Sequence, residues 1–306
     1  MNFTAKDVAA LREKTGCGMM DCKKALTEAD GNAEKAVEIL REKGLAAQTK
    51  KAGRIAAEGM VHVYIDRDKK AGCMIEVNSE TDFVAKNAEF RALVEGAAKA
   101  VVDYNPASVE ELLTCKFEDT TDTVEDVLRE KILKIGENMK IRRFERLEGD
   151  LVSYTHGGGS AACVALFETG NADSADFQDL GKNICMQVVA MTPDYLCPEE
   201  VPAEVVESEK NILIAQIKND PKSANKPDAV IEKMVMGKIN KYYQENCLLK
   251  QAYVKDNKMS VEQYINQSAK DFGFDIKLVK FVTYEKGEGL EKRQDDFASE
   301  VASMTK

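Results

Sequence analysis

The chain has 306 residues, enough for about two domains with a buried core. Asp and Glu outnumber Lys and Arg, 53 to 43, so the net charge is −10. This balance argues against direct binding to nucleic acids or to anionic membrane surfaces, because both need basic faces on the protein. No run of about eighteen apolar residues is present, so we expect no membrane span.

Residues 1–54 are expected to form a small three-helix domain with a linker. Its third helix is predicted to begin at an Asn32 cap and to end at Gly44. The unit resembles the ubiquitin-associated fold. Met19 and Met20 follow a glycine, so they either form an exposed contact surface or fill a very small core, and the sequence leaves both open. Lys23 falls on the polar face.

Residues 55–148 are expected to form the first half of an α+β core. Val61, Val63 and Ile65 alternate with His62 and Tyr64, and this period of two predicts a strand. A polar hairpin loop, a second strand over 73–77 and a helix over 88–102 follow. Ser108 to Glu111 reads as a capping box, and a strand is expected over 141–147. One longer helix is predicted from the stripe Val124, Leu128, Ile132, Ile135 and Met139.

The segment Thr81-Asp82-Phe83-Val84-Ala85-Lys86-Asn87 lies at the corner between that second strand and its helix. Thr81 and Asp82 are expected to cap the helical turn that follows. A phenyl ring at such a corner either folds back over the helix start or stays exposed to a partner beside the carboxylate of Asp82. The residues alone leave both interpretations of Phe83 open.

An internal repeat pairs the region after Glu58 with the region after Glu148, and 148 − 58 is 90. Cys73 and Cys163 show the same offset. The second half of the core is therefore expected over 149–286, again as a hairpin followed by a helix. Its equivalent corner, 168–173, contains no aromatic residue.

A helical hairpin is predicted as an insertion at about 200–244, where apolar residues recur at helical spacing. It carries more apolar residues than two helices bury easily, which predicts either a homodimer or packing back onto the domain. Residues 287–306 are expected to form a C-terminal helix module with Phe297, Val301 and Met304 on one face. Such a helix docks on its own protein or on a partner.

No catalytic apparatus is apparent in the sequence. The phosphate-binding pattern G-x-x-x-x-G-K-[ST] is absent, and the eight cysteines include no C-x-x-C pair. With only two histidines, zinc spacing is also absent, so we expect no metal, no cofactor and no enzyme activity. The first residues show no signal or transit character, and the cysteines are expected to be free thiols in the cytoplasm.

Several stretches together resemble the family of bacterial translation elongation factor Ts. They are TDFVAKN over 81–87, TGCGMMDCKKAL over 15–26, KKAGRIAAEG over 50–59, KIGENMKIRR over 134–143 and EGDLVSYTHG over 148–157. The resemblance covers nearly the whole chain. It implies guanine-nucleotide exchange on elongation factor Tu in its GDP-bound state.

By this resemblance, one stretch enters the partner near its Mg²⁺ and the nucleotide β-phosphate: Thr81, Asp82, Phe83 and Val84. The other partner contacts that it implies are Met19, Met20, Lys23, Ile135, Gly136 and His156. An adaptor of the ubiquitin-associated type, binding through the loop at Met19 and Met20, is the alternative, although it leaves 55–306 unexplained. A Cys-dependent enzyme built on Cys73 or Cys163 is a third reading.

Overall fold

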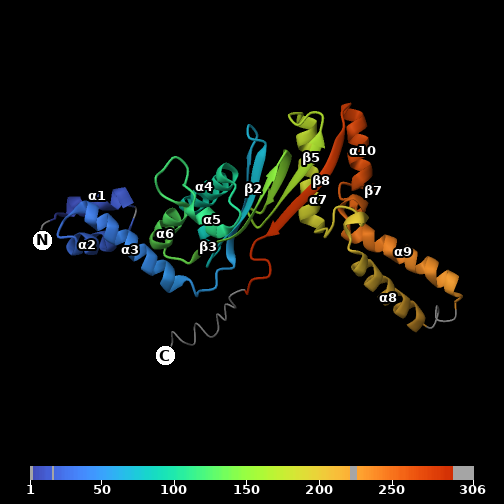
Figure 1. Ribbon diagram of the computed structural model, residues 1–306, viewed down its shortest axis with the longest axis horizontal. Helices are drawn as coiled ribbons and strands as arrows, with labels where there is room; N and C mark the ends of the chain where they lie inside the picture. The colour runs from blue at the N-terminus through green and yellow to red at the C-terminus, as the bar shows by residue number, and fades with distance from the viewer. Residues whose placement is uncertain (1–2, 16, 221–225, 292–306) are drawn as a thin grey trace. The chain divides into compact units, whose positions relative to one another are not determined.

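The computed structural model describes residues 3–15, 17–220 and 226–291, with the backbone alone over 45–50. The fold is α+β, with helices packed on small antiparallel sheets (Figure 1). Two compact units divide the chain. The first comprises Met1–Leu147, Thr155–Ala162 and Tyr284–Lys306, and the second comprises Glu148–Tyr154 and Cys163–Thr283. The predicted C-terminal residues Phe297, Val301 and Met304 lie outside the described residues.

Three helices open the first unit: α1 (Ala5–Thr15), α2 (Met19–Glu28) and α3 (Ala33–Lys51). They enclose a small core that includes Leu11, Cys22 and Leu26. The predicted cap is confirmed, because the side chain of Asn32 accepts a hydrogen bond from the Lys35 N–H at 3.0 Å. The predicted helix end at Gly44 is wrong. The helix continues to Lys51 and packs on α6, where a Cβ at Gly44 would make an ordinary contact 3.7 Å from the backbone oxygen of Arg129.

The first sheet has the strand order β1-β2-β3. Its strands are β1 (Glu58–Asp66), β2 (Ala71–Ser79) and β3 (Met139–Glu148), and its helices are α4 (Ala88–Tyr104), α5 (Val109–Thr114) and α6 (Val124–Ile135). Strands β1 and β2 pair antiparallel, with Tyr64 opposite Cys73. The strand predicted from the alternation over 61–65 is confirmed within β1. Met60 and Tyr64 pack into the helix-covered core, whereas Val61 is buried outside that cluster. Every residue of β2 is buried, so both faces of this strand are covered. An alternation of polar and apolar residues therefore does not mark a single buried face there.

Two helix boundaries differ from the prediction. Gly136, with a positive φ of 89°, ends α6, and Met139 begins β3 instead of continuing the helical stripe. At α5, the Ser108 hydroxyl accepts from the Glu111 N–H as expected, at 3.2 Å. The Glu111 carboxylate, however, accepts from the N–H of Ala107 at 2.7 Å and not from Ser108, so the capping box is only half formed.

The second unit is built around the sheet β4-β5-β8. Its elements are β4 (Asp150–His156), β5 (Ala161–Thr169), α7 (Ala175–Met191), α8 (Ala203–Asn219), α9 (Asp228–Asn246), β6 (Ala252–Tyr253), β7 (Asp256–Ser260), α10 (Val261–Phe272) and β8 (Ile276–Glu285). Helices α8 and α9 lie side by side as a hairpin (Figure 1). They share a separate apolar cluster: Leu213, Ile217, Ile231, Val235 and Ile239.

The two copies of the repeat have matching elements with one difference in spacing. Strands β2 and β5 begin at Ala71 and Ala161, and 161 − 71 is 90. Helices α4 and α7 begin at Ala88 and Ala175, and 175 − 88 is only 87. The loop between strand and helix is therefore three residues longer in the first copy. That loop contains the 3₁₀ turn Val84–Lys86. Among the described helices, none has both the length and the apolar character to cross a membrane.

Candidate functional site

The corner between β2 and α4 presents one large apolar side chain to solvent. Phe83 is 76% exposed, whereas its neighbour Val84 is 4% exposed and belongs to the core of the first unit. Asp82 is also exposed, and the ammonium group of Lys86 lies 5.9 Å from the centroid of the Phe83 ring. The ring therefore does not fold back over the helix start. Val84 holds the loop in the core, and Phe83 is left pointing outward.

Thr81 does not cap the following helical turn, which corrects the prediction. Its backbone N–H and its hydroxyl both donate to the Glu137 carboxylate, at 2.9 and 2.7 Å, and Ser79 Oγ donates to the Thr81 carbonyl oxygen at 2.9 Å. The 3₁₀ turn has no side-chain cap, so Asp82 does not cap it either. Asn87 caps α4 instead, accepting from the Glu89 N–H at 2.8 Å. The carboxylate of Glu137 is charged, so hydrogen bonds from Thr81 to it are stronger than hydrogen bonds between Thr81 and the neutral groups of the turn.

Glu80 joins the base of the corner to the segment that follows Gly136. Its carboxylate accepts from the Asn138 N–H at 2.6 Å and pairs with Arg54 at 3.3 Å. Asn138 Nδ2 in turn donates to the Arg54 carbonyl oxygen at 2.9 Å. The sequence suggested Glu80 as a turn residue and as a weak candidate for an acid pair with Asp82, but its bonds in the structure go to Asn138 and Arg54. The sequence did not single out Glu137 or Asn138, although both lie within the KIGENMKIRR stretch. The partners that position the corner come from a distant part of the chain.

Glu89, in the first turn of α4, ties this helix to α6. Its carboxylate pairs with Lys131 at 2.7 Å and with Lys134 at 2.8 Å. The hydrogen bonds from Lys131 and Lys134 lower the pKa of Glu89 to about 2. The two ion pairs fix the start of α4, and with it the end of the corner, against the last two turns of α6.

The structure brings some of the predicted contact residues together and leaves others on separate elements. Ile135 and Gly136 directly precede Glu137, so they adjoin the corner through the Thr81 hydrogen bonds. Ile135 is half-buried and Gly136 is exposed. Met19, Met20 and Lys23 are exposed at the start of α2, which answers the question left open for the two methionines: they do not fill the small core. His156 is exposed at the hairpin turn after β4.

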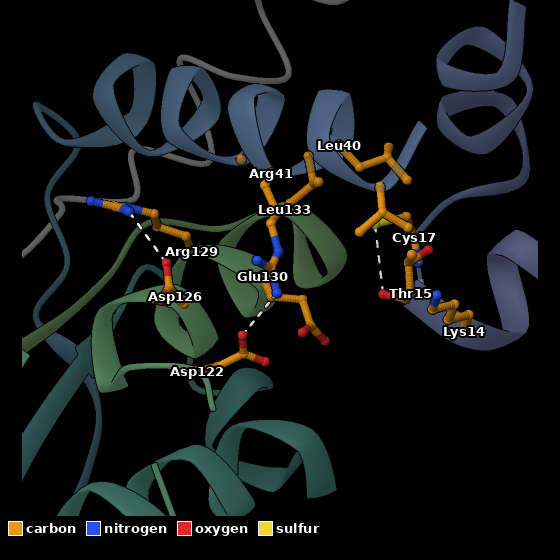
Figure 2. Close-up of a pocket in the computed structure, with 12 residues that line it drawn as sticks. Lys14, Thr15, Cys17, Leu40, Arg41, Asp122, Asp126, Arg129, Glu130 and Leu133 are labelled. Atoms are coloured by element: carbon orange, nitrogen blue, oxygen red, sulfur yellow. Dashed lines mark hydrogen bonds and ion pairs between the residues drawn. The ribbon is translucent and has the colours of Figure 1, made fainter. Parts of the chain in front are cut away.

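A cavity of about 270 Å³ lies between the N-terminal helices and α6 (Figure 2). Figure 2 shows Arg41 directed toward Asp122, with which it pairs at 2.8 Å. The residues that line the cavity are Lys14, Thr15, Cys17, Val37, Leu40, Arg41, Gly44, Asp122, Asp126, Arg129, Glu130 and Leu133. Three cationic and three anionic side chains balance one another there, and none of the predicted contact residues lines the cavity.

The thiols considered as nucleophiles lie in the cores. Cys73 and Cys163 are buried, and burial raises the pKa of both thiols, which keeps them protonated and unreactive. Over the described residues, no group of three His, Cys, Asp or Glu side chains could hold a metal ion. The corner itself offers a phenyl ring, a carboxylate and an ammonium group. These groups can bind a partner, but they include no pair of nucleophile and base.

Comparison with known proteins identifies the family. The family model described as Elongation factor TS matches residues 80–288, which begin at the corner. A protein named Elongation factor Ts from Clostridium perfringens (strain SM101 / Type A) is 50% identical over 305 residues, covering 99% of each chain. Another from Clostridium botulinum (strain Eklund 17B / Type B) is 47% identical over 305 residues, again with 99% of each chain covered. The chain therefore belongs to the elongation factor Ts family of translation elongation factors.

Proposed function

We propose that the protein is a guanine-nucleotide exchange factor that binds GDP-bound elongation factor Tu and speeds release of the GDP, so that GTP can bind. The membership in the elongation factor Ts family supports this proposal. The observation that carries it is the exposed ring of Phe83 on a corner that is tied down at both ends. A ring in this setting is already in a binding conformation before the partner arrives, which reduces the entropy lost on binding.

The corner acts on the partner's nucleotide site indirectly. In GTP-binding proteins, the phosphates are held by Mg²⁺ and by the backbone N–H groups of a phosphate loop. Phe83 enters between partner helices and shifts that loop, and the Asp82 carboxylate competes for the cationic site, so Mg²⁺ is displaced. Thr81 and Val84 hold these two side chains in place from either side. None of the four residues bonds to GDP, and the protein carries out no chemical step.

The size of the effect requires more than one contact. Each tenfold faster release corresponds to about 1.4 kcal/mol. Burying the Phe83 ring in a partner contributes roughly 1.5–3 kcal/mol, which accounts for about one to two decades. The remaining acceleration is assigned to the other residues of the proposed interface, which are exposed except for the half-buried Ile135: Met19, Met20, Lys23, Ile135, Gly136 and His156.

The helical hairpin α8–α9 is assigned a different role in this proposal, as a homodimer contact. Its inner faces share one apolar cluster, yet Ile212, Val230 and Met236 remain exposed on its outside. Exposed apolar side chains on a two-helix hairpin favour association with another surface. The exposed Met19 and Met20 also fit the alternative, an adaptor that binds through the three-helix domain alone. We place the proposed exchange reaction in the cytoplasm.

Release of labelled GDP from elongation factor Tu, measured with and without this protein, tests the proposal. We expect faster release that depends on the concentration of this protein and that is reduced in the Phe83→Ala variant. Unchanged release at concentrations where the two proteins form a complex would contradict the exchange function. If residues 1–54 alone then bound the same partner as tightly as the full chain, the adaptor reading would replace it.

A further inference from the structure

Glu76 is a carboxylate with no exposed surface at the centre of the first sheet. It accepts hydrogen bonds from four donors: Asn78 Nδ2 at 3.0 Å, Arg142 Nη1 at 3.1 Å, Arg143 Nε at 2.7 Å and the Gly287 N–H at 2.8 Å. Burial by itself raises the pKa of Glu76, but the bonds from Gly287, Asn78, Arg143 and Arg142 together lower it. A buried charge with this many partners is tightly oriented.

Three of these donors connect Glu76 to the chain segment 285–288, which we call the strap. Gly287 contributes its backbone N–H directly, while Arg142 Nη2 donates to the Glu288 carbonyl oxygen at 2.6 Å. Arg143 pairs with the Glu288 carboxylate at 2.9 Å. Lys286 forms an ion pair with Glu58 of β1. The strap is therefore held to β1 and β2 through side chains that meet at Glu76 or close to it.

The strap also holds the turn that carries His156, residues 156–160. The Lys286 N–H donates to the Ser160 carbonyl oxygen at 2.9 Å. From its other side, the turn is held by β1, because the Val61 N–H donates to the Gly159 carbonyl oxygen at 2.8 Å. Inside the turn, the N–H groups of Gly159 and Ser160 donate to the His156 carbonyl oxygen, each at 3.0 Å. The position of His156 thus depends on both β1 and the strap.

We propose that Glu76 is a positioning residue, which acts through the strap to fix the His156 turn relative to the corner at Thr81–Val84. Glu76 and the corner lie on one continuous stretch of chain, since β2 ends at Ser79 and the corner follows. One buried carboxylate therefore aligns two surfaces that are far apart in sequence. The proposal rests on the proposed exchange function, in which both surfaces contact elongation factor Tu. Glu76 itself contacts only groups of its own chain.

Gly287→Ala separates the strap from Glu76 without changing any charge. Gly287 has a φ of +69°, and a Cβ there would lie 2.2 Å from the Ala57 carbonyl oxygen, so the strap must move. Gly289→Ala is the matched control. Gly289 also has a φ of +69°, but nothing lies within 4 Å of its added Cβ, so it introduces the same backbone strain without the collision. Glu76→Gln is the second variant and removes the charge at the other end.

Hydrogen exchange of the full chain is the first measurement. We expect faster exchange at the Ser160 and Lys286 amides in Gly287→Ala and in Glu76→Gln, and unchanged exchange there in Gly289→Ala. Equal protection of the turn in all four proteins would overturn the proposal. This result does not depend on elongation factor Tu, so it separates a failure of the positioning role from a failure of the exchange function.

GDP release from elongation factor Tu is the second measurement. We expect GDP release with Gly287→Ala to be about fivefold slower than with the control Gly289→Ala. This is the effect of losing a coupling of about 1 kcal/mol. The loss should disappear when His156 is already alanine, and it should persist when Phe83 is alanine. Equal losses in all three backgrounds would show general destabilisation and would overturn the role assigned to Glu76. If the unaltered chain fails to speed release, the exchange function itself has failed.

Discussion

The carboxylate of Glu137 accepts two hydrogen bonds from Thr81, one from the backbone N–H at 2.9 Å and one from the hydroxyl at 2.7 Å. The two residues are 56 positions apart. A carboxylate that accepts both donors of one residue fixes its backbone as well as its side chain. The exposed part of the corner, with Phe83 at its tip, therefore begins from a rigid base and not from a free loop.

Replacing Phe83 with Ala should separate activity from stability. Because the ring is 76% exposed, we expect the free energy of unfolding to change by less than about 1 kcal/mol. GDP release from elongation factor Tu should slow by about one to two decades, because the partner loses the buried ring. Melting temperature and release should be measured on the same preparation.

Val84→Ala is the matched control for that experiment, since the neighbouring side chain is buried. It should destabilise the fold by about 2 kcal/mol, the order expected for deleting buried methyl groups. A large melting loss for Phe83→Ala with normal release at low temperature would mean that the ring stabilises the fold in solution, and the proposed wedge would be lost.

Asp82→Asn removes the charge at the corner and keeps its shape. We expect slower GDP release, but a smaller loss than for Phe83→Ala, because the displacement by the ring remains. The difference between variant and parent should shrink when Mg²⁺ is chelated, since the carboxylate then has no cation for which to compete with the phosphates. A loss that is the same with and without Mg²⁺ would remove the electrostatic part of the mechanism.

Glu137→Gln should loosen the corner without touching the partner-facing side chains. The neutral amide can still accept from the Thr81 N–H and donate to the Thr81 hydroxyl, but it lacks the charge that strengthens both hydrogen bonds, so the substitution costs about 1 kcal/mol locally. We expect faster hydrogen exchange at Thr81 and slower GDP release with Phe83 still in place. Glu34→Gln is the surface control, at an exposed position of α3 outside the corner. Normal protection of Thr81 in Glu137→Gln would show that other contacts fix the corner.

Acid should weaken the contact between α4 and α6. The folded-state pKa of Glu89, about 2, lies below the ordinary glutamate value of 4.5, so its ion pairs stabilise the fold fully above about pH 4.5. Their contribution falls as the pH drops from about 4.5 toward 2 and is absent below that. The side chain is 40% exposed, so solvent screening keeps the contribution within about 1 kcal/mol. The unfolding free energies of the parent and Glu89→Gln should therefore differ at pH 7 and converge near pH 2. A gap that widens in acid would contradict this.

Deleting the α8–α9 hairpin should leave most exchange activity in place. Its apolar cluster is formed within the hairpin, so a short Gly/Ser bridge that replaces residues 203–246 removes that cluster as a unit. We expect a folded protein with near-parental GDP release and a smaller apparent mass in analytical ultracentrifugation, because the proposed homodimer contact is gone. A deletion that stays folded and loses exchange would show that the hairpin contacts elongation factor Tu.

The helices of the core were predictable because one face of each is apolar over several turns. Phe90, Leu93 and Val101 of α4 are buried as their spacing predicts, and so are Phe177 and Ile184 of α7. The alternation over 61–65 correctly predicted strand β1 but not which of its faces packs on the helices, because its residues are buried or half-buried on both faces. At Gly44, local propensity predicted an end, but the helix continues and packs on α6.

At the candidate site, sequence reasoning found the exposed groups and missed their support. A local pattern shows that an aromatic residue lies at a corner, and the resemblance of TDFVAKN to a known family favours the exposed interpretation. No local pattern relates Thr81 to Glu137 or Glu76 to Gly287, since these pairs are joined only by the folded topology. The same holds for Asn87, whose role as the cap of α4 depends on the 3₁₀ turn before it.

The loop of the first copy exceeds its counterpart by three residues, and the strand and helix on either side keep their lengths. The corner is thus an addition to a scaffold that the second copy completes without it. In evolutionary terms, this separates two selective pressures. The scaffold can drift under selection for stability alone, while the inserted turn drifts with the partner's surface. If the corner contacts the partner as proposed, its sequence can change with the partner's surface while the packing of the strand on its helix stays the same.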